Sequence, residues 1–453
     1  MPNHSAVIGD RLELEIDGMA HEGQGVGRWQ GVAVFISGAL PGERVLARVR
    51  RVAKRHLEAD LLGVERPSPE RRRPACILAD RCGSCSLQHA SAEAQANYKQ
   101  DLVAQALRRI GSLDVAVDPI WSATGELGYR NRALIPLERT PEGVLRAGYY
   151  RRGSHKLVNL TRCPVLDPRI DRLIAPIKDD LEASGWPVDV NLTGEGGLRH
   201  LALRVGQHTG EVLITLVSSH GVLPGLSELA QAWQQRWPDV VGVCLNLQPR
   251  ATNTVMGAHT ETISGRPWLK ERFAGQELLI GADTFFQVNT LQAERLVPLL
   301  KEAFAPLQQR TLVDAFCGVG TFSLPLAAAG AEVFGLESHA GSVEQARANA
   351  ARNQLRRALF EQTDVAAVLA SRLQAADGLL VDPPRKGLSP EATAAILEAR
   401  PKQLAYISCN PATLARDLGL LCETNTYRVL RVQPVDFFPQ TSHVETVALL
   451  ERV

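Results

Sequence analysis

The chain has 453 residues, and its 50 basic and 49 acidic side chains give a formal net charge of +1. A hydrophobic content of 45% with 22% charged residues excludes a disordered or fibrous chain, and the length predicts roughly two to four domains. The apolar stretches are too short for a membrane span and the N-terminus lacks a signal-peptide pattern, so we expect a cytoplasmic protein with no membrane partner.

Positive charge is concentrated in two windows of the chain. Residues 44–73 and residues 130–172 each hold ten Arg or Lys against four acidic residues, which gives each window a net charge of +6. The remainder of the chain then carries −11. Such basic segments either bind phosphate groups or form a solvated Arg-rich surface, and the charge pattern alone leaves both interpretations open.

The N-terminal region shows short alternating runs between Gly-rich turns over residues 11–64. The runs are LELEID, GVAVFIS, RVLARVR and HLEADLLGV. This pattern predicts a small antiparallel barrel of the oligonucleotide-binding kind. Residues 65–74, ERPSPERRRP, are too rich in proline and charge to pack, and we interpret them as a linker.

A cysteine group follows this segment. Cys76, Cys82 and Cys85 are separated by five and two residues, and Cys163 precedes a proline. In a long chain without a secretion signal, clustered cysteines indicate metal ligands or catalysts more than disulfides. The spacing favours an iron–sulfur cluster over zinc, which prefers two close pairs, while unligated cysteines are the third alternative.

The middle of the chain mixes helical and strand-like patterns. A helix is expected over residues 91–110 and another near residues 226–237. Strand-like runs such as LRAGYYRR, HLALRV and GEVLITLVS lie within residues 128–265. Together they predict a mixed α/β domain.

From about residue 310 strands alternate with helices, which predicts a doubly wound, mostly parallel sheet. The last two strands read as a hairpin. The expected strands are residues 311–316, 331–337, 358–364, 378–384, 403–410, 427–438 and 443–453.

A ligand-binding pattern follows the first of these strands, in the sequence DAFCGVGT that begins at Asp314. Gly318 and Gly320 let the backbone approach a ligand, and the carboxyl end of the first strand is where open α/β sheets bind nucleotides. A dinucleotide motif would need a third glycine, but position 323 is serine. The pattern therefore favours S-adenosylmethionine (AdoMet) over NAD.

Acidic residues at the ends of the next three strands support this interpretation. Glu337 ends the second strand, where a carboxylate can accept hydrogen bonds from both hydroxyls of a ribose. Asp364 ends the third strand, at a position suited to an adenine edge, and Asp382 ends the fourth. Acids at four successive strand ends predict an AdoMet site.

Cys409, in the sequence SCNP, ends the fifth strand, where we expect it to face the ligand crevice. Addition of a thiolate to carbon 6 of a pyrimidine makes carbon 5 nucleophilic enough to take a methyl group, and a base must then remove the carbon 5 proton. Glu445, on the otherwise apolar last strand, is the candidate base. The alternatives are a buried structural cysteine and a glutamate that points to water.

These features together resemble the RNA uracil-5-methyltransferase family, most closely its 23S rRNA (uracil-C5)-methyltransferase D type. The resemblance spans nearly the whole chain and rests on the runs VFISGALPGERV, GADTFFQVN, DAFCGVGTFSLPLA, VDPPRKG and SCNPATLARDL. It implies a multidomain α/β protein with three parts: a TRAM barrel of the oligonucleotide-binding fold over residues 1–66, an iron–sulfur-containing central α+β domain over 67–92 and 125–270, and a Rossmann-like AdoMet-dependent methyltransferase domain over 93–124 and 271–453.

The resemblance also implies roles for single residues. Cys409 would be the nucleophile and Glu445 the base, acting on one uridine of 23S rRNA. AdoMet would contact Gln287, Phe316, Thr321, Glu337, Asp364 and Asp382. A 4Fe-4S cluster would be held by Cys76, Cys82, Cys85 and Cys163.

Further implications concern partners and alternatives. Residues 91–121 should pack on the methyltransferase domain despite their place in the sequence, and the protein should be a monomer with no DNA partner. A tRNA uridine-5-methyltransferase is the second interpretation, disfavoured because the tRNA enzyme of the family lacks the barrel and the cysteine group. A non-catalytic, metal-containing RNA-binding protein is the third.

Overall fold

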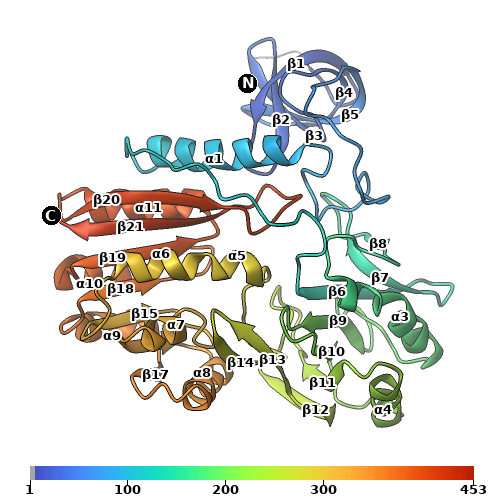
Figure 1. Cartoon of the computed structure of the whole chain (residues 1–453). Coiled ribbons are helices and arrows are strands. Elements are labelled where there is room, and N and C mark those ends of the chain that lie inside the picture. The colour runs from blue at the N-terminus through green and yellow to red at the C-terminus, as the bar shows by residue number, and fades with distance from the viewer. Residues whose placement is uncertain (1–5) are drawn as a thin grey trace.

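A closed barrel forms the N-terminal end of the computed structural model, which describes residues 6–453 (Figure 1). In β1 every second side chain is buried, so that Leu12, Leu14 and Ile16 form one row of the barrel core. The strands lie in the order β1-β2-β3-β5-β4. They are β1 (Arg11–Met19), β2 (Gln24–Trp29), β3 (Val32–Ser37), β4 (Arg44–Val52) and β5 (His56–Arg66).

The strand β2 was expected to be a Gly-rich connection, and this expectation was wrong. β2 pairs with both β1 and β3, and its glycines permit that pairing. A Cβ atom on Gly27 would come within 2.4 Å of the Glu15 carbonyl oxygen, and one on Gly25 within 2.8 Å of the Ala39 carbonyl oxygen. The glycines therefore serve close approach of neighbouring strands and not a flexible turn.

Residues 65–74 are also not the loose linker that their composition suggested. The Arg71 side chain donates hydrogen bonds to both oxygens of Glu43, at 2.5 and 2.8 Å, and to the Gly38 carbonyl oxygen at 2.6 Å. Glu43 is fully buried, and its Oε1 also accepts a hydrogen bond from the Ser68 backbone N–H. Because the charges neutralise each other, the segment packs against the barrel.

The central region contains a seven-stranded mixed sheet with the order β12-β11-β10-β9-β6-β7-β8, which confirms the predicted mixed α/β character. All side chains of β9 and β10 are buried, and helices cover the sheet. Its strands are β6 (Arg132–Arg139), β7 (Leu145–Tyr150), β8 (Leu157–Asn159), β9 (Leu198–Val205), β10 (Val212–Ser218), β11 (Val240–Leu247) and β12 (His259–Gly265), and its helices are α2 (Pro168–Asp171), α3 (Ile174–Ala183) and α4 (Leu226–Arg236).

The C-terminal region holds a second seven-stranded sheet with the order β17-β16-β15-β18-β19-β21-β20. The first five strands in this order are parallel, and β20 and β21 form the predicted antiparallel hairpin. The strands are β15 (Thr311–Ala315), β16 (Glu332–Glu337), β17 (Ala358–Gln362), β18 (Gly378–Val381), β19 (Gln403–Ser408), β20 (Tyr427–Val435) and β21 (Glu445–Arg452). The doubly wound sheet is thereby confirmed.

Helices cover both faces of this sheet, and a short β-ribbon joins it to the central region (Figure 1). The ribbon consists of β13 (Trp268–Phe273) and β14 (Gln276–Gly281). The helices are α5 (Thr290–Glu294), α6 (Leu296–Ala303), α7 (Ser323–Ala328), α8 (Ala340–Arg352), α9 (Val365–Leu373), α10 (Pro390–Ala399) and α11 (Pro411–Cys422). No helix within residues 6–453 is both long and apolar enough to cross a membrane.

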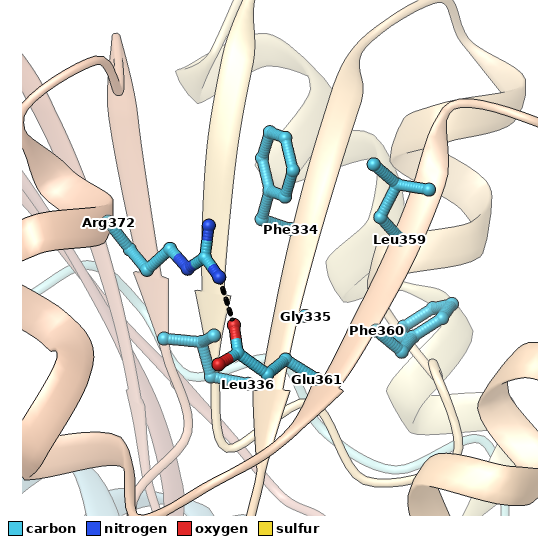
Figure 2. Close-up of a pocket in the computed structure, with 7 residues that line it drawn as sticks. All are labelled: Phe334, Gly335, Leu336, Leu359, Phe360, Glu361 and Arg372. Atoms are coloured by element: carbon cyan, nitrogen blue, oxygen red, sulfur yellow. Dashed lines mark hydrogen bonds and ion pairs between the residues drawn. The ribbon is translucent and has the colours of Figure 1, made fainter.

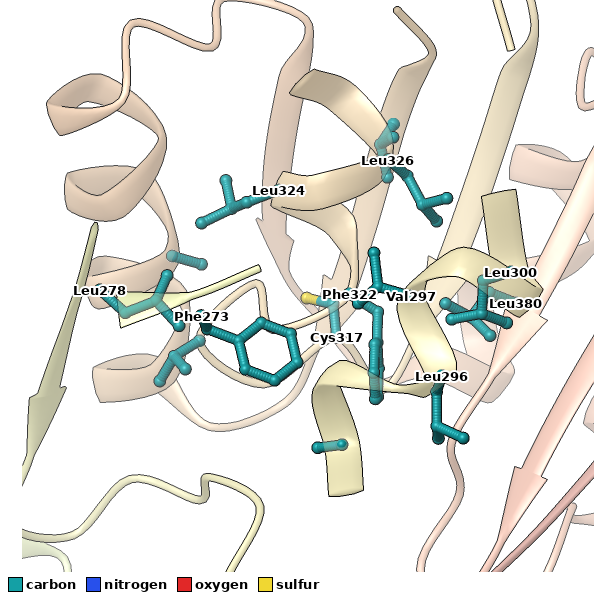
Figure 3. Packing of buried hydrophobic residues seen from close by; sticks show 14 of the residues in the cluster. Phe273, Leu278, Leu296, Val297, Leu300, Cys317, Phe322, Leu324, Leu326 and Leu380 are labelled. Atoms are coloured by element: carbon teal, nitrogen blue, oxygen red, sulfur yellow. The ribbon is translucent and has the colours of Figure 1, made fainter. Parts of the chain in front are cut away.

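The ribbon is fixed by aromatic packing in the core (Figure 3). Phe273 of β13 makes edge-to-face contacts with Phe286 and Phe322, with ring centroids 5.8 and 6.0 Å apart. Cys317 is buried in the same cluster and serves as a small hydrophobe. This core fixes the loop after β15 against the ribbon.

Helix α1 (Ala92–Arg109) lies against the C-terminal sheet, although the central region separates the two in sequence (Figure 1). The Ser91 hydroxyl caps the helix by accepting a hydrogen bond from the Ala94 N–H at 3.1 Å. The helix packs on α11 and β20, and its Lys99 forms a buried ion pair with Asp436 at 2.6 Å. The predicted packing of this segment on the C-terminal domain is confirmed.

Candidate active site

Strand pairing brings Asp382, Cys409 and Glu445 to one edge of the C-terminal sheet. Val381, the last residue of β18, pairs with Tyr406 of β19, and Ser408 of β19 pairs with Thr446 of β21. Cys409 and Glu445 therefore lie opposite each other one step beyond that pair, and Asp382 follows its strand to the same end. We call this end, where β15, β16, β18 and β19 stop, the carboxyl edge.

Glu445 is a buried carboxyl group, with a residue exposure of only 3%. Burial raises its pKa well above the ordinary value, the charge of Asp382 raises it further, and Arg385 acts in the opposite direction. The alternative of a glutamate that points to water was wrong. A carboxyl group with a raised pKa at this place can accept a proton near neutral pH.

Cys409 is half-buried, so its thiol is accessible from the edge of the sheet. Burial raises its pKa to about 11, and the charges of Glu445 and Asp382 contribute to the rise. Arg385 lowers the same pKa through its charge and a side-chain hydrogen bond. Arg385 is thus the group that favours the thiolate, and it follows the two prolines after Asp382.

Two further carboxyl groups lie at the carboxyl edge, the buried Asp314 and the half-buried Asp382. Asp314 is held by a hydrogen bond from the Ser323 hydroxyl at 2.5 Å, and burial raises its pKa to about 7. Burial and the charge of Asp314 raise the pKa of Asp382 to about 7 as well, while Gln287 Nε2 donates a hydrogen bond to Asp382 Oδ2 at 3.1 Å. No cation forms an ion pair with either carboxylate within residues 6–453.

Glu337 lies at the end of β16, beside the loop that follows β15. Its Oε2 accepts a hydrogen bond from the Gly318 N–H at 3.3 Å, and its Oε1 accepts from the N–H groups of Ser338 and His339 at 2.7 and 2.8 Å. Phe316 in this loop has a φ of +72°, which is unfavourable for a phenylalanine, and Gly318 has a φ of +56°. Strained backbone of this kind is common where a loop is shaped for a ligand.

The remaining two predicted AdoMet contacts have different surroundings. Asp364 is exposed, and its carboxylate caps α9 by accepting a hydrogen bond from the Ala366 N–H at 3.1 Å. Thr321 is buried in the loop after β15, next to Gly320. Asp364 therefore already has a structural use, and its contact with an adenine stays a prediction.

A separate hollow of about 290 Å³ lies along β16, β17 and α9 (Figure 2). Phe334, Leu359 and Phe360 line it, and the Glu361–Arg372 ion pair at 2.5 Å lies on its wall. None of the residues predicted to contact AdoMet lines this hollow. It is therefore distinct from the carboxyl edge.

The four predicted cluster ligands lie near one another in space. Burial raises the pKa of Cys85 to about 11, with contributions from the charges of Cys82 and Cys76. Burial likewise raises the pKa of Cys163 to about 12, with contributions from Cys85 and Cys76. Within residues 6–453, however, no group of His, Cys, Asp or Glu is arranged to hold a metal ion. The iron–sulfur cluster stays a prediction.

A polar network that sequence reasoning missed connects the cysteine group to the carboxyl edge. Gln440, in the segment between β20 and β21, bonds to four separate parts of the chain. Its backbone N–H donates to Gln95 Oε1 at 2.8 Å and its carbonyl oxygen accepts from the Leu87 N–H at 2.9 Å. Its side chain accepts from Arg72 at 3.1 Å and donates to Glu126 at 2.9 Å. We call these residues, together with the Lys99–Asp436 pair, the junction.

The basic window over residues 44–73 is largely neutralised within the fold. Six of its arginines form ion pairs with nearby carboxylates. They are Arg44, Arg50, Arg51, Arg66, Arg71 and Arg72. The charge excess of this window therefore overstates the positive charge that is free to meet a ligand.

Known proteins resemble this chain over most of its length. The family described as tRNA (Uracil-5-)-methyltransferase matches residues 209–453, and the TRAM domain matches residues 6–62. A protein of Parasynechococcus marenigrum named an uncharacterized RNA methyltransferase is 49% identical over 448 residues, which cover 98% of this chain and 96% of that protein. A protein of the same description from Listeria innocua is 35% identical over 442 residues and covers 97% of each chain.

A solved structure extends the comparison to three dimensions. The Pyrococcus abyssi tRNA (uracil-54, C5)-methyltransferase in complex with S-adenosyl-L-homocysteine is 29% identical, with a TM-score of 0.78. The match covers 97% of this chain and 99% of that chain, so it includes the barrel region. The argument that a barrel disfavours a tRNA substrate was therefore wrong.

Proposed function

The chain belongs to the uracil-5-methyltransferase family of RNA methyltransferases, and we propose that it transfers a methyl group from AdoMet to carbon 5 of a uridine in 23S rRNA. The observation that carries the proposal is the carboxyl edge, where Cys409 and Glu445 lie opposite each other beside Asp382. A nucleophile and a buried base on adjacent strands are the two groups that this reaction needs. We also propose that the enzyme is cytoplasmic and acts as a monomer.

The charge of the carboxyl edge supports AdoMet as the methyl donor. AdoMet has a positive sulfonium and a positive ammonium group, whereas the buried Asp314 and the half-buried Asp382 have no paired cation in the described structure. A cationic ligand would stabilise both carboxylates. A Cβ atom on Gly318 would meet only the Phe285 carbonyl oxygen, at 4.0 Å, so the loop is open for a ligand at this point. We assign the contacts to Gln287, Phe316, Thr321, Glu337, Asp364 and Asp382.

The chain's own residues have distinct tasks in the proposed reaction. The Cys409 thiolate, favoured by Arg385, forms a bond to carbon 6 of a flipped-out uracil and pushes electrons onto carbon 5. AdoMet, when bound, supplies the methyl group that carbon 5 takes up. The Glu445 carboxylate then removes the carbon 5 proton, and the bond between carbon 6 and the Cys409 sulfur breaks as the ring double bond returns.

A tRNA is the second candidate for the RNA substrate. A tRNA uridine is favoured by the match over nearly the full length to the Pyrococcus abyssi enzyme, whose name states a tRNA substrate. The 23S rRNA assignment is supported by the resemblance of the chain's motifs to the ribosomal branch. A non-catalytic RNA-binding role is disfavoured by the opposed Cys409 and Glu445.

A methyl-transfer assay with two substrates tests the proposal. Unmodified 23S rRNA and unmodified tRNA are incubated with the protein and labelled AdoMet, and the labelled nucleotide is mapped. We expect 5-methyluridine at one position of 23S rRNA, and loss of turnover with retained AdoMet binding in Cys409→Ala. Methylation of tRNA alone would transfer the assignment to tRNA, and full activity of Cys409→Ala would overturn the mechanism.

We further propose that Cys76, Cys82, Cys85 and Cys163 hold a 4Fe-4S cluster. Their mutual effect on the thiol pKa values supports a shared site, because neighbouring thiolates repel each other unless a cation lies between them. Iron and sulfide analysis of protein purified without oxygen tests this assignment. About four iron and four sulfide per chain are expected for such a cluster, and protein that folds and methylates RNA without iron would contradict it.

A further inference from the structure

A second pocket, away from the residues assigned to AdoMet, has the composition of a nucleic-acid site. Its volume is about 530 Å³, within the usual range for ligand sites. It is lined by Gly83 and Ser84, in the cysteine segment (residues 76–86), and by residues 149–155, which are the end of β7 and the turn that follows it. We call it the turn pocket.

Free positive charge lies in the turn pocket. Arg151 and Arg152 line it and Lys156 follows it, and none of the three forms an ion pair with a carboxylate in the described part of the chain. Among residues 6–453 the Arg152 side chain makes one hydrogen bond, a long one of 3.5 Å to the Cys85 carbonyl oxygen. The basic window over residues 44–73 differs, because most of its arginines are paired with carboxylates. Unpaired arginines favour an anionic ligand.

Arg50 of the barrel reaches the rim of the same pocket. Its Nη1 lies 3.3 Å from the position that a Cβ atom on Gly153 would occupy. Arg50 is paired with Glu58 at 2.9 Å, so it brings the barrel next to the turn pocket without adding a free charge. The barrel, the cysteine segment and the central sheet therefore meet at this point.

Aromatic rings stand beside these cations. Tyr149 and Tyr150 line the turn pocket and are half-buried, and the rings of Tyr150 and His155 meet edge to face with centroids 5.9 Å apart. Rings next to arginines are the combination with which proteins bind unpaired nucleotides, by stacking on the base and ion-pairing with the phosphate.

The cysteine segment links the turn pocket to the proposed active site. Ser86, two residues after Ser84, accepts a hydrogen bond through its Oγ from the Ser442 N–H at 3.0 Å. Ser442 lies three residues before Glu445. The lining residue Ser84 is therefore close in sequence to a residue that contacts the segment before the proposed base.

We propose that the turn pocket binds an unpaired nucleotide of the RNA substrate, with its phosphate on Arg151 and Arg152 and its base against Tyr150. The inference rests on the proposed function for the identity of the ligand, and it assigns a second contact point away from the reacting uridine. A two-point hold of this kind would fix the direction of the strand relative to Cys409.

Binding and cross-linking together test the turn pocket. The affinity of the full-length protein for a labelled single-stranded oligouridylate is measured against salt concentration for the wild type, Arg151→Ala, Arg152→Ala and the control Arg356→Ala. Arg356 is an exposed arginine before β17 without an ion pair in the described structure, so its removal changes the total charge equally. AdoMet binding and melting temperature show whether each variant is folded.

Arg151→Ala and Arg152→Ala should each weaken binding roughly fivefold at physiological salt and lower the salt slope by about one. The control should do neither, and both variants should raise KM for RNA more than they lower kcat. A 4-thiouridine oligonucleotide should cross-link to the peptide that contains residues 149–155. If Arg151→Ala binds like Arg356→Ala, or if the cross-links map elsewhere, the proposal is overturned. Wild-type protein that binds and cross-links as expected but methylates no RNA would overturn the proposed function and leave the turn pocket standing.

Discussion

The carboxyl edge and the junction are both built from buried or partly buried polar groups, but their charges are balanced in opposite ways. At the junction each acid has a cation: Lys99 pairs with Asp436, and Arg72 with Glu126. At the carboxyl edge Asp314 and Glu445 are buried beside the half-buried Asp382, and Arg385 is a cation that acts on Glu445 alone of the three.

This difference separates structure from function in the molecule. Paired charges at the junction fix α1 against the segment before Glu445. At the carboxyl edge burial raises the pKa values of Asp382 and Glu445, and the charges of neighbouring carboxylates add to the rise. These raised pKa values cost stability and leave the site ready for a cationic ligand and for proton transfer. An excess of buried like charge therefore marks the reactive part of the chain.

The largest effect is expected from removal of the base at the carboxyl edge. Glu445→Gln keeps the shape of the side chain but cannot accept the carbon 5 proton, so turnover should fall roughly 100-fold to 10,000-fold. The methylated RNA should then remain attached to Cys409. A denaturing gel with labelled RNA measures the attached fraction.

Glu451→Gln, on the same strand but partly exposed and paired with Arg428, is the matched control and should retain turnover. Normal turnover of Glu445→Gln would remove Glu445 from the mechanism. A loss of turnover without attached RNA would place its role before methyl transfer.

The next effect concerns the junction. Lys99→Met leaves Asp436 buried without its cation, so the free energy of unfolding should fall by about 3 to 5 kcal/mol. Chemical denaturation measures this change. Lys402→Met, which alters an exposed lysine, should change stability little, and equal stability of the two variants would show that the Lys99 pair does not hold α1 in place.

Removal of one carboxyl group from the carboxyl edge should raise the free energy of unfolding, whereas Lys99→Met should lower it. Because the pKa of Asp314 is raised to about 7, the folded protein keeps a proton that the unfolded chain loses near pH 4, and wild-type stability falls as the pH rises between these values. Asp314→Asn avoids this loss and should gain up to roughly 4 kcal/mol above about pH 7.

Thermal unfolding of Asp314→Asn across this pH range measures the gain, with the exposed Asp101→Asn as the control. The gain should shrink toward about pH 4, and AdoMet should bind the variant more weakly. If the stability difference between Asp314→Asn and the wild type did not vary with pH, the raised pKa of Asp314 would be contradicted.

The smallest effect is expected for an exposed ion pair. Arg428 and Glu451 lie 2.9 Å apart at the outer hairpin, with the Arg428 side chain largely exposed. Arg428→Ala should cost less than about 1 kcal/mol, and the loss should decrease with added salt. If Arg428→Ala lost as much stability as Lys99→Met, burial would not be what makes the Lys99–Asp436 pair matter more than the exposed Arg428–Glu451 pair.

The sequence predicted the regular sheets and the reactive strand ends because both depend on local patterns. Alternation in β1 and the strand–helix repeat after residue 310 are visible within a few residues, and so are Cys409 and Asp382. β2 was missed because its glycines serve contact with Ala39 and Glu15, which only the closed barrel brings close.

The junction and the role of Arg385 could not be predicted in this way. Gln95 and Gln440 are 345 residues apart in sequence, and no periodicity connects them. The burial of Glu445 was equally undetermined, since strand alternation allows either face. The signal available for Arg385 was its position after the two prolines that follow Asp382, but its effect on Cys409 depends on strand order.

The most direct test of the account traps the bond between Cys409 and RNA. In a substrate RNA that carries 5-fluorouridine, Glu445 has no proton to remove from carbon 5, so the covalent complex cannot resolve. We predict a complex that survives denaturation, requires AdoMet, contains the nucleotide on Cys409 and is absent in Cys409→Ala. The account is contradicted if the wild type methylates normal RNA but forms no such complex, or if the nucleotide is found on another cysteine.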